Sequence, residues 1–478
     1  MTRHVELLEP DTEEERSRSE SLAAFVERAT WDAITERARE ALKVRVLDSL
    51  GCAFGAAGGE PVRIIRQNVD EFGGNPICTL IGGGRTAPDR AAFYNGALIR
   101  YLDFNDSYLA RGETCHPSDN IGAVLAAAEY ALLSGRQFLT ALAVAYQVQC
   151  RLSDEAPVRA RGFDHTTQGA FAVAAGVSKA LELNRSQTVN ALGISGTANN
   201  ALRVTRTGEL SHWKGLAYPN TAFDGLRAAF LAMRGITGPR EVFEGNKGWI
   251  QTISGDFEID WDHEDLERVT RTILKKYDAE IHSQSALEAM IELRNRYRID
   301  ARAIDRIRVD IFNVAHLIIG GGVEGDKTVV RTKEEADHSL PYMIAAAAID
   351  GQVLPAQYRP ERIAADDVQS LLRRVEVVPD PGYSARFPDQ HACRVTVTMG
   401  NGERFEREKS DYEGFRTRPM SWDRVVEKFE SLSGEATDPI LRREIVDGVR
   451  FLDQLTVKEF TDLLGETGPG FVRHRRAV

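Results

Sequence analysis

RYLDFNDSYLARGETCHPSDN, residues 100–120, is the stretch where an apolar helix gives way to a loop rich in acids. It contains Asp103, Asp106, His116 and Asp119. If the helix continued into this stretch, Asp103 and Asp106 would share one face about a turn apart. Such a carboxylate pair can hold one raised pKa and transfer protons. The alternative is a helix that simply ends in solvated acids.

Helices are predicted on both sides of the stretch. The first begins at Pro88 and Asp89, which are favoured at helix starts, and its apolar residues recur at three- and four-residue spacing. The second, from Ile121 to Leu133, follows His116 directly. A helix N-terminus lowers the pKa of a nearby imidazole or attracts an anion. His116 is therefore a candidate proton-transfer residue, with an ordinary surface histidine as the alternative.

The first half of the chain predicts an all-α block rich in alanine. The further helices predicted there are 30–50, 61–72, 138–152, 170–183, 186–202 and 221–233. Residues 78–81 predict a short strand, and the glycine triplet after it lacks the spacing of a phosphate loop. Polar loops around His165 and around Lys214 lie between the helices and are candidate binding segments, although Lys214 alone could be a solvated cation.

The apolar periodicity changes near Asp260 and changes back near Pro419. Residues 307–311, 374–378 and 393–399 alternate like strands, and Gly400-Asn401-Gly402 predicts a hairpin to a strand near Phe405. Helices are predicted at 285–297, at 341–349 and again up to Leu464. We therefore predict a mainly α fold with two domains. Residues 1–264 and 416–478 form an all-α domain, and residues 265–415 form an α+β lid.

The composition excludes several classes of protein. With 478 residues, of which 42% are hydrophobic and 27% charged, the chain is typical of a soluble globular protein. No apolar run approaches the roughly eighteen residues of a membrane helix. The formal net charge of -11 disfavours a general nucleic-acid binder. We expect no membrane or nucleic-acid partner.

The cysteines and the N-terminus indicate the compartment. Five cysteines at wide spacing, with no CxxC, predict neither a disulfide framework nor a zinc or iron-sulfur site. Residues 1–20 are acidic and lack an apolar segment of the kind found in secretory signals. A cytoplasmic protein is expected.

Five strings together resemble the MmgE/PrpD family over nearly the whole chain. They are YLDFNDSYLARGETCHPSDN (101–120), RGFDHTTQG (161–169), SHWKGLA (211–217), EIHSQSALEA (280–289) and ADHSLPYMIAAAAIDG (336–351). The resemblance implies an all-α domain with a smaller α+β lid, a homodimer, and an active-site cleft between the domains. It implies no metal and no cofactor, although Asp103, Asp106 and His116 are residue types that could bind a divalent ion.

The family includes a 2-methylcitrate dehydratase, a cis-aconitate decarboxylase and an iminodisuccinate epimerase, and HSQSALEA and DHSLPY look most like the dehydratase branch. The resemblance therefore implies a metal-independent hydro-lyase that converts 2-methylcitrate to 2-methyl-cis-aconitate in the methylcitrate cycle of propionate catabolism. Decarboxylation of cis-aconitate, or epimerisation, is the alternative. A helical scaffold protein is disfavoured, because a scaffold has no need of histidines and lysines in separate loops.

The resemblance also implies the site residues. The implied catalytic residues are Asp103, His116, His165, Lys214 and Tyr342, and the implied substrate-binding residues are Arg206, Lys276, His282 and His338. Dehydration needs a base, an acid for the departing hydroxyl, and cations that hold the carboxylates. We expect His116, oriented by Asp103, to transfer the proton, and Lys214 and His282 to contact the carboxylates of a tricarboxylate substrate.

Overall fold

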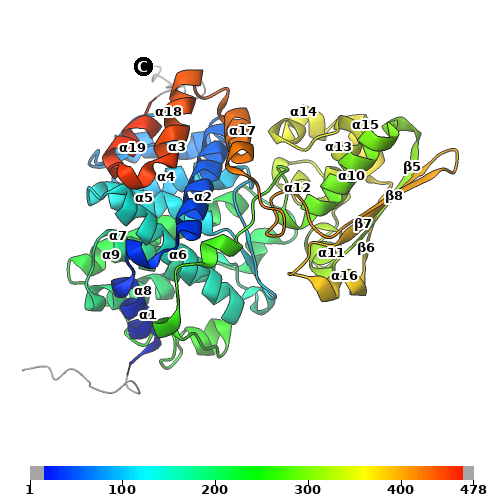
Figure 1. Ribbon diagram of the computed structural model, residues 1–478. Helices are drawn as coiled ribbons and strands as arrows, with labels where there is room; N and C mark the ends of the chain where they lie inside the picture. Colours follow the sequence, from blue (N-terminus) through cyan, green and yellow to red (C-terminus); the bar gives the residue numbers. More distant parts are fainter. Residues whose placement is uncertain (1–15, 467–478) are drawn as a thin grey trace, which may run out of the picture.

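The computed structural model of the protein describes residues 16–466. It consists of a larger helical body and a smaller body in which helices pack on a mixed sheet (Figure 1). The predicted mainly α fold with two domains is confirmed. Residues 1–15 and 467–478, which we assigned to the all-α domain, lie outside the described residues.

The larger body contains helices from both ends of the chain. These are α1 (Arg18–Arg28), α2 (Glu36–Gly55), α3 (Glu60–Phe72), α4 (Pro88–Tyr101), α5 (Ile121–Tyr130), α6 (Gly135–Glu155), α7 (Thr166–Ala180), α8 (Arg185–Ala198), α9 (Trp213–Met233), α17 (Trp422–Ser433), α18 (Pro439–Arg450) and α19 (Val457–Leu464). Among residues 16–466 no helix is both long enough and apolar enough to cross a membrane.

The C-terminal helices share the core of the N-terminal ones. In that core Phe429 of α17 packs edge to face on Phe54 of α2, with ring centroids 6.2 Å apart. Ile445 of α18 and Phe460 of α19 are buried in the same core. Since helices that bury one apolar face in a common core fold together, we propose to keep residues 416–466 with the helical domain.

Two helices differ from their predicted bounds because packing overrides the local signals. The helix predicted from residue 30 begins only after Thr35, whose hydroxyl accepts from the Ala38 amide, and it runs past Gly51. A Cβ at Gly51 would lie 3.1 Å from Phe429 Cα, so this glycine permits a close helix contact and does not end the helix. The helix predicted from residue 221 begins at Trp213 and includes Pro219.

The crossing of α4 and α5 positions the stretch with which the sequence analysis began. At the crossing, a Cβ on Gly122 would lie 2.8 Å from Gly96 N and 2.9 Å from Ala92 O. Only a residue without a side chain allows this approach. As a result the end of α4 lies near the start of α5. The chain between them forms a short hairpin of β3 (Tyr108–Leu109) and β4 (Thr114–Cys115).

The smaller body is built on a four-stranded sheet in the order β6-β5-β7-β8. The strands are β5 (Ile304–Ile311), β6 (Val375–Pro379), β7 (Cys393–Met399) and β8 (Arg404–Lys409), and the helices are α10 (Gln284–Tyr297), α11 (Asn313–Ile319), α12 (Lys333–Ala336), α13 (Leu340–Asp350), α14 (Pro360–Ile363), α15 (Asp366–Leu372) and α16 (Pro381–Arg386). β5 is parallel to β6, and the other pairs are antiparallel. The predicted strands and the β7–β8 hairpin are confirmed, as is the predicted strand at 78–81, which pairs as β1 (Cys78–Thr79) with β2 (Arg85–Thr86).

The packing of α17 on α2 makes the proposed domain division testable. Every tryptophan of the chain lies outside residues 265–415, so tryptophan fluorescence reports unfolding of the helical part. Replacing the fully buried Phe429 by Ala should lower the free energy of unfolding followed by this signal by about 3–5 kcal/mol. Phe451→Ala, a control at a residue that is 48% exposed, should change it by about 0.5 kcal/mol. An unchanged tryptophan transition in Phe429→Ala would contradict the division.

Candidate active site

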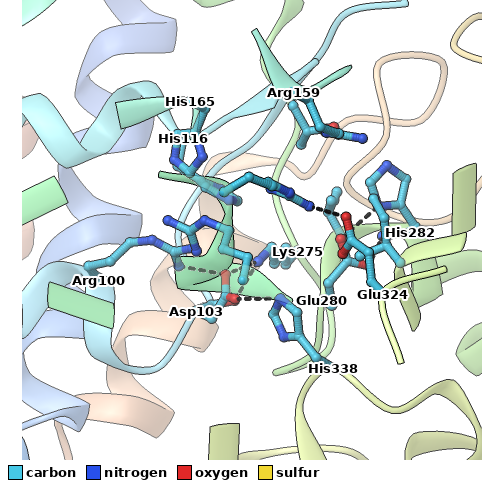
Figure 2. A pocket seen from close by; sticks show the side chains of 15 residues that line it. Arg100, Asp103, His116, Arg159, His165, Lys275, Glu280, His282, Glu324 and His338 are labelled. Atoms are coloured by element: carbon cyan, nitrogen blue, oxygen red, sulfur yellow. Dashed lines mark hydrogen bonds and ion pairs between the residues drawn. The ribbon is translucent and has the colours of Figure 1, made fainter. Parts of the chain in front are cut away.

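A polar cavity lies where the two bodies meet, and it contains about 420 Å³ of space free of atoms, its open mouth included. Its lining side chains are Arg100, Asp103, Thr114, His116, Arg159, His165, Arg203, Arg206, Lys275, Glu280, Ile281, His282, Ile318, Glu324 and His338 (Figure 2). Five of them are Arg or Lys, four are His and three are carboxylates. This composition is typical of a site that binds an anionic ligand and transfers protons to or from it.

Asp103 lies at the base of the cavity because α4 ends just before it. The helix stops at Tyr101, and Asp103 has a φ of 59°, a conformation that side chains other than glycine adopt only when their surroundings impose it. The helix therefore does not continue through Asp106, and the expectation that the two carboxylates share one helix face is wrong. The side chain of Asp106 instead accepts hydrogen bonds from Tyr146 and from the Ser118 amide.

Cations surround the Asp103 carboxylate. Its Oδ1 lies 2.6 Å from Arg100 Nη1 and 2.7 Å from Lys275 Nζ, and its Oδ2 lies 3.3 Å from Lys214 Nζ. Burial alone would raise the pKa of this carboxyl, but the three cations hold it well below its usual range. Asp103 is therefore a fixed negative charge near neutral pH, which suits it to holding cations and not to accepting protons.

His116 is oriented by the backbone and not by Asp103, which corrects the expected pairing. Its Nδ1 lies 2.8 Å from the carbonyl oxygen of Asp106 and 3.1 Å from the Ser107 hydroxyl. A carbonyl only accepts, so we assign the imidazole proton to Nδ1 and a lone pair to Nε2. Burial lowers the pKa of His116 well below its usual value, and the charges of Arg100 and Lys275 lower it further. His116 is thus a neutral base at the cavity wall.

The other three cavity histidines each hold Nδ1 against a neighbouring carboxylate. The pairs are His165 with Asp164 at 3.2 Å, His282 with Glu280 at 2.6 Å, and His338 with Asp337 at 2.8 Å. Nε2 of His165 and of His282 is buried without a hydrogen-bond partner among the described residues. Burial lowers the pKa of His165 well below its usual value, and burial together with Lys214 lowers that of His338 to about 4.

Three further arginines line the cavity. Arg206 donates from Nε to Asp164 Oδ2 at 2.6 Å, and Nη2 of Arg159 lies 3.3 Å from Glu113 Oε1. Arg203 Nη2 lies 2.6 Å from Glu324 Oε1. Each of these planar guanidinium groups is therefore paired with a carboxylate of the protein.

Most of the predicted site residues reach this cavity. Asp103, His116, His165, Arg206, His282 and His338 line it. Three predicted residues do not line it. Lys214, which was expected to contact a substrate carboxylate, has its ammonium 3.3 Å from Asp103 Oδ2 and 2.7 Å from Asp337 Oδ1. The ammonium of Lys276 lies 3.1 Å from Glu288 and 2.9 Å from Glu413, away from the lining. Tyr342 is fully buried in the core of the smaller body, where its hydroxyl donates to the Gln357 carbonyl.

Several lining residues were not singled out from the sequence. Lys275, not Lys276, extends to Asp103, and its ammonium also donates to the Asp103 carbonyl. Glu280 opens the string EIHSQSALEA, and Arg100 directly precedes the first string, so the segments that carry the resemblance were a usable signal. Arg159 and Arg203 lie in loops with no distinguishing pattern.

One group in the cavity has the donor types of a metal site. Asp103, Asp337 and His338 each offer a ligand atom, and these atoms lie within 4.8 Å of one another. Lys214 Nζ, however, lies 2.7 Å from Asp337 Oδ1 and 3.3 Å from Asp103 Oδ2. An ammonium in contact with both carboxylates opposes a divalent cation at the same place. Metal independence stays a prediction.

Comparison with known proteins gives a consistent family. The model of the MmgE/PrpD N-terminal domain matches residues 20–262, and that of the MmgE/PrpD C-terminal domain matches residues 277–454. The 2-methylcitrate dehydratase of Escherichia coli (strain K12) is 27% identical to the chain, over 79% of this chain and 82% of the relative. The cis-aconitate decarboxylase of Homo sapiens is also 27% identical, over 95% and 96%. The 2-methylcitrate dehydratase of Cupriavidus necator is 29% identical, over 79% and 82%.

The adjacent lysines offer a matched test of the cavity. Lys275→Met removes a cation from Asp103 and the cavity, so kcat/KM should fall by roughly a hundredfold or more. Lys276→Met removes an ion pair whose lysine side chain is 26% exposed, so kcat/KM should stay within about fivefold of its normal value. Circular dichroism should show both variants folded. Equal losses of activity in the two variants would contradict the assignment.

Proposed function

We propose, because the chain belongs to the MmgE/PrpD family, that it is a hydro-lyase acting on a citrate-like tricarboxylate. The first candidate reaction is conversion of 2-methylcitrate to 2-methyl-cis-aconitate, in the methylcitrate cycle of propionate catabolism. Relatives named 2-methylcitrate dehydratase support this choice. The observation that carries the proposal is the position of His116, whose Nδ1 lies 2.8 Å from the Asp106 carbonyl oxygen, in a cavity lined by five cationic side chains.

His116 is the proposed base. Its Nδ1 is engaged by the Asp106 carbonyl, so the lone pair on Nε2 is available to take the proton from the carbon next to a substrate carboxylate. The electron pair left on that carbon spreads into the carboxylate. Cations held in place before the reaction stabilise this developing charge without reorganisation. Lys275 and Arg100, both anchored on Asp103, are suited to this role.

His282 is the proposed acid for the departing hydroxyl. Glu280 Oε1 lies 2.6 Å from its Nδ1, and a carboxylate in this position stabilises the protonated imidazole. Burial alone would raise the pKa of Glu280, but the neighbouring His282 lowers it to about 2. Glu280 itself therefore remains ionised. When the carbon–oxygen bond breaks, the hydroxyl takes the proton from His282 Nε2 and leaves as water. His116 then holds the proton removed from carbon.

Decarboxylation of cis-aconitate is the second candidate. The cis-aconitate decarboxylase of Homo sapiens covers more of the chain than the two bacterial dehydratases do, at a similar identity. Both reactions build up negative charge on a carbon next to a carboxylate, so the same cations serve either one. A homodimer and a cytoplasmic location stay predictions.

Replacing His116 tests its role. His116→Ala should lower kcat by roughly a hundred- to ten-thousandfold, the usual contribution of a positioned base. In the unaltered protein the lowered pKa keeps His116 neutral as the pH falls through 6.5, so kcat, which does not depend on ionisation of the free substrate, should not begin to fall until well below that pH. An acid limb centred near 6.5, or near-normal turnover in His116→Ala, would reject the assignment.

The substrate is tested by product analysis. We expect 2-methylcitrate and citrate both to lose water, because a methyl group contributes only about 1–3 kcal/mol of discrimination. Malate should be a poor substrate, since it leaves part of the cationic lining without a partner. Purified protein should be offered each compound and cis-aconitate, and the products identified by mass spectrometry. If the protein forms itaconate from cis-aconitate and removes water from neither citrate nor 2-methylcitrate, the dehydratase proposal is wrong and decarboxylation takes its place.

A further inference from the structure

We propose that Arg203 is the subsite for one carboxylate of the substrate and that the chain's own Glu324 occupies this subsite until substrate displaces it. The inference rests on the proposed function for the identity of the substrate. The subsite itself requires only that the ligand carries a carboxylate or a similar anion.

The cations of the cavity are already paired with carboxylates of the protein. Arg100 and Lys275 are held by Asp103, and Arg206 is held by Asp164 through both Nε and Nη2. A tricarboxylate that entered this cavity would therefore find few free cations, although its three charges need several. Binding therefore requires that a carboxylate of the substrate displaces a carboxylate of the protein from its cationic partner.

Glu324 is the lining carboxylate that is held least. Asp103 contacts three cations, and both oxygens of Glu280 accept hydrogen bonds from His282. Glu324, in contrast, makes one ion pair, from Oε1 to Arg203 Nη2 at 2.6 Å (Figure 2). Its Oε2 is buried and has no hydrogen-bond partner among the described residues. A buried carboxylate oxygen without a partner is costly, so release of Glu324 to water recovers solvation free energy.

The segment that carries Glu324 is suited to moving. Residues 320–332 link α11 to α12 without helix or strand, and Gly321 and Gly325 have φ values of 96° and 111°. The backbone of Glu324 makes long hydrogen bonds, to Leu317 O at 3.4 Å and from Gly208 N at 3.3 Å. Lys327 O accepts from the Ser339 hydroxyl, Val330 O accepts from Gln369, and Val330 is buried in the core of the smaller body, so movement is confined to residues 320–326.

Arg203 is suited to receiving a ligand in place of Glu324. Its side chain is 13% exposed and lies at the cavity wall, and its nearest other carboxylate oxygen, on Asp164, is 3.8 Å away. Its planar guanidinium can bind a carboxylate through two parallel hydrogen bonds. Exchange of Glu324 for a substrate carboxylate keeps the charge on Arg203 paired throughout. The exchange also couples substrate entry to movement of residues 320–326.

The test uses the charge of Glu324. Glu324→Gln keeps the size of the side chain but removes the competing anion, so the dissociation constant for citrate, measured by calorimetry, should fall roughly tenfold. Asp326→Asn is the matched control. It removes a charge from the same segment, where the Asp326 carboxylate accepts only from Thr328 among residues 16–466, and it should change the constant by less than about twofold.

A double-mutant cycle assigns the effect to Arg203. Arg203→Gln should weaken citrate binding, and in the Arg203→Gln background Glu324→Gln should bring no further gain. Citrate binding by Glu324→Gln that is equal to or weaker than that of the unaltered protein would overturn the proposal. The proposal would also be overturned if Glu324→Gln tightened citrate binding as much in the Arg203→Gln background as in the unaltered protein.

A second probe separates this proposal from the proposed function. If no variant binds citrate, the tricarboxylate function is wrong, but the subsite can still be tested with inorganic sulfate. At constant ionic strength, millimolar sulfate should raise the Tm of Glu324→Gln more than that of the unaltered protein or of Asp326→Asn. Equal shifts in all three proteins would overturn the subsite.

Discussion

Burial of the Asp103 carboxylate among cations is the interaction on which the site depends. Arg100 reaches it from the end of α4, Lys214 from the first turn of α9 and Lys275 from the segment that leads into the smaller body. Removal of one partner from such a buried ion network typically costs about 3–5 kcal/mol, because a charge is left uncompensated. The network therefore holds three distant parts of the chain in one geometry, and it keeps the cations of the cavity ordered before any ligand arrives.

Beyond the effect of burial, the same network acts on two of the histidines, because Arg100 and Lys275 lower the pKa of His116 and Lys214 lowers the pKa of His338. Positive charge and burial together favour the neutral imidazole, which is the form that can accept a proton. A cavity that attracts carboxylates thus also prepares its own bases, and both properties follow from one set of cations. The carboxylates paired with His165, His282 and His338 have a different effect, since each contacts Nδ1 and fixes the orientation of its ring. Asp164 and Asp337 also raise the pKa of their histidines, in opposition to burial.

Much of the fold could be predicted from local patterns. Strands β5 and β7 alternate in burial as their residues alternate in polarity, and the helices with clear apolar periodicity are present. The misplaced boundaries have a common reason. Gly51 and Pro219 are residues that usually end helices, but here each lies inside one, and at Gly51 the missing side chain allows α17 to approach. The local sequence cannot show whether such a residue ends a helix or lies inside one, where tertiary packing accommodates it.

By itself, the sequence determined the two kinds of domain, the family and several of the segments that line the cavity, because these depend on patterns within short stretches. Only the tertiary structure decided which side chains meet. Lys275 and Lys276 are adjacent residues of the same type, so local sequence does not distinguish them. Packing directs Lys275 toward Asp103 and Lys276 toward Glu288. Two other contacts likewise have no sequence signal. They are the hydrogen bond of His116 with a backbone carbonyl and the ion pair of Arg203 with Glu324, which lies far along the chain. The direction of a side chain from a loop is set by its neighbours in space, and these neighbours come from loops on both bodies.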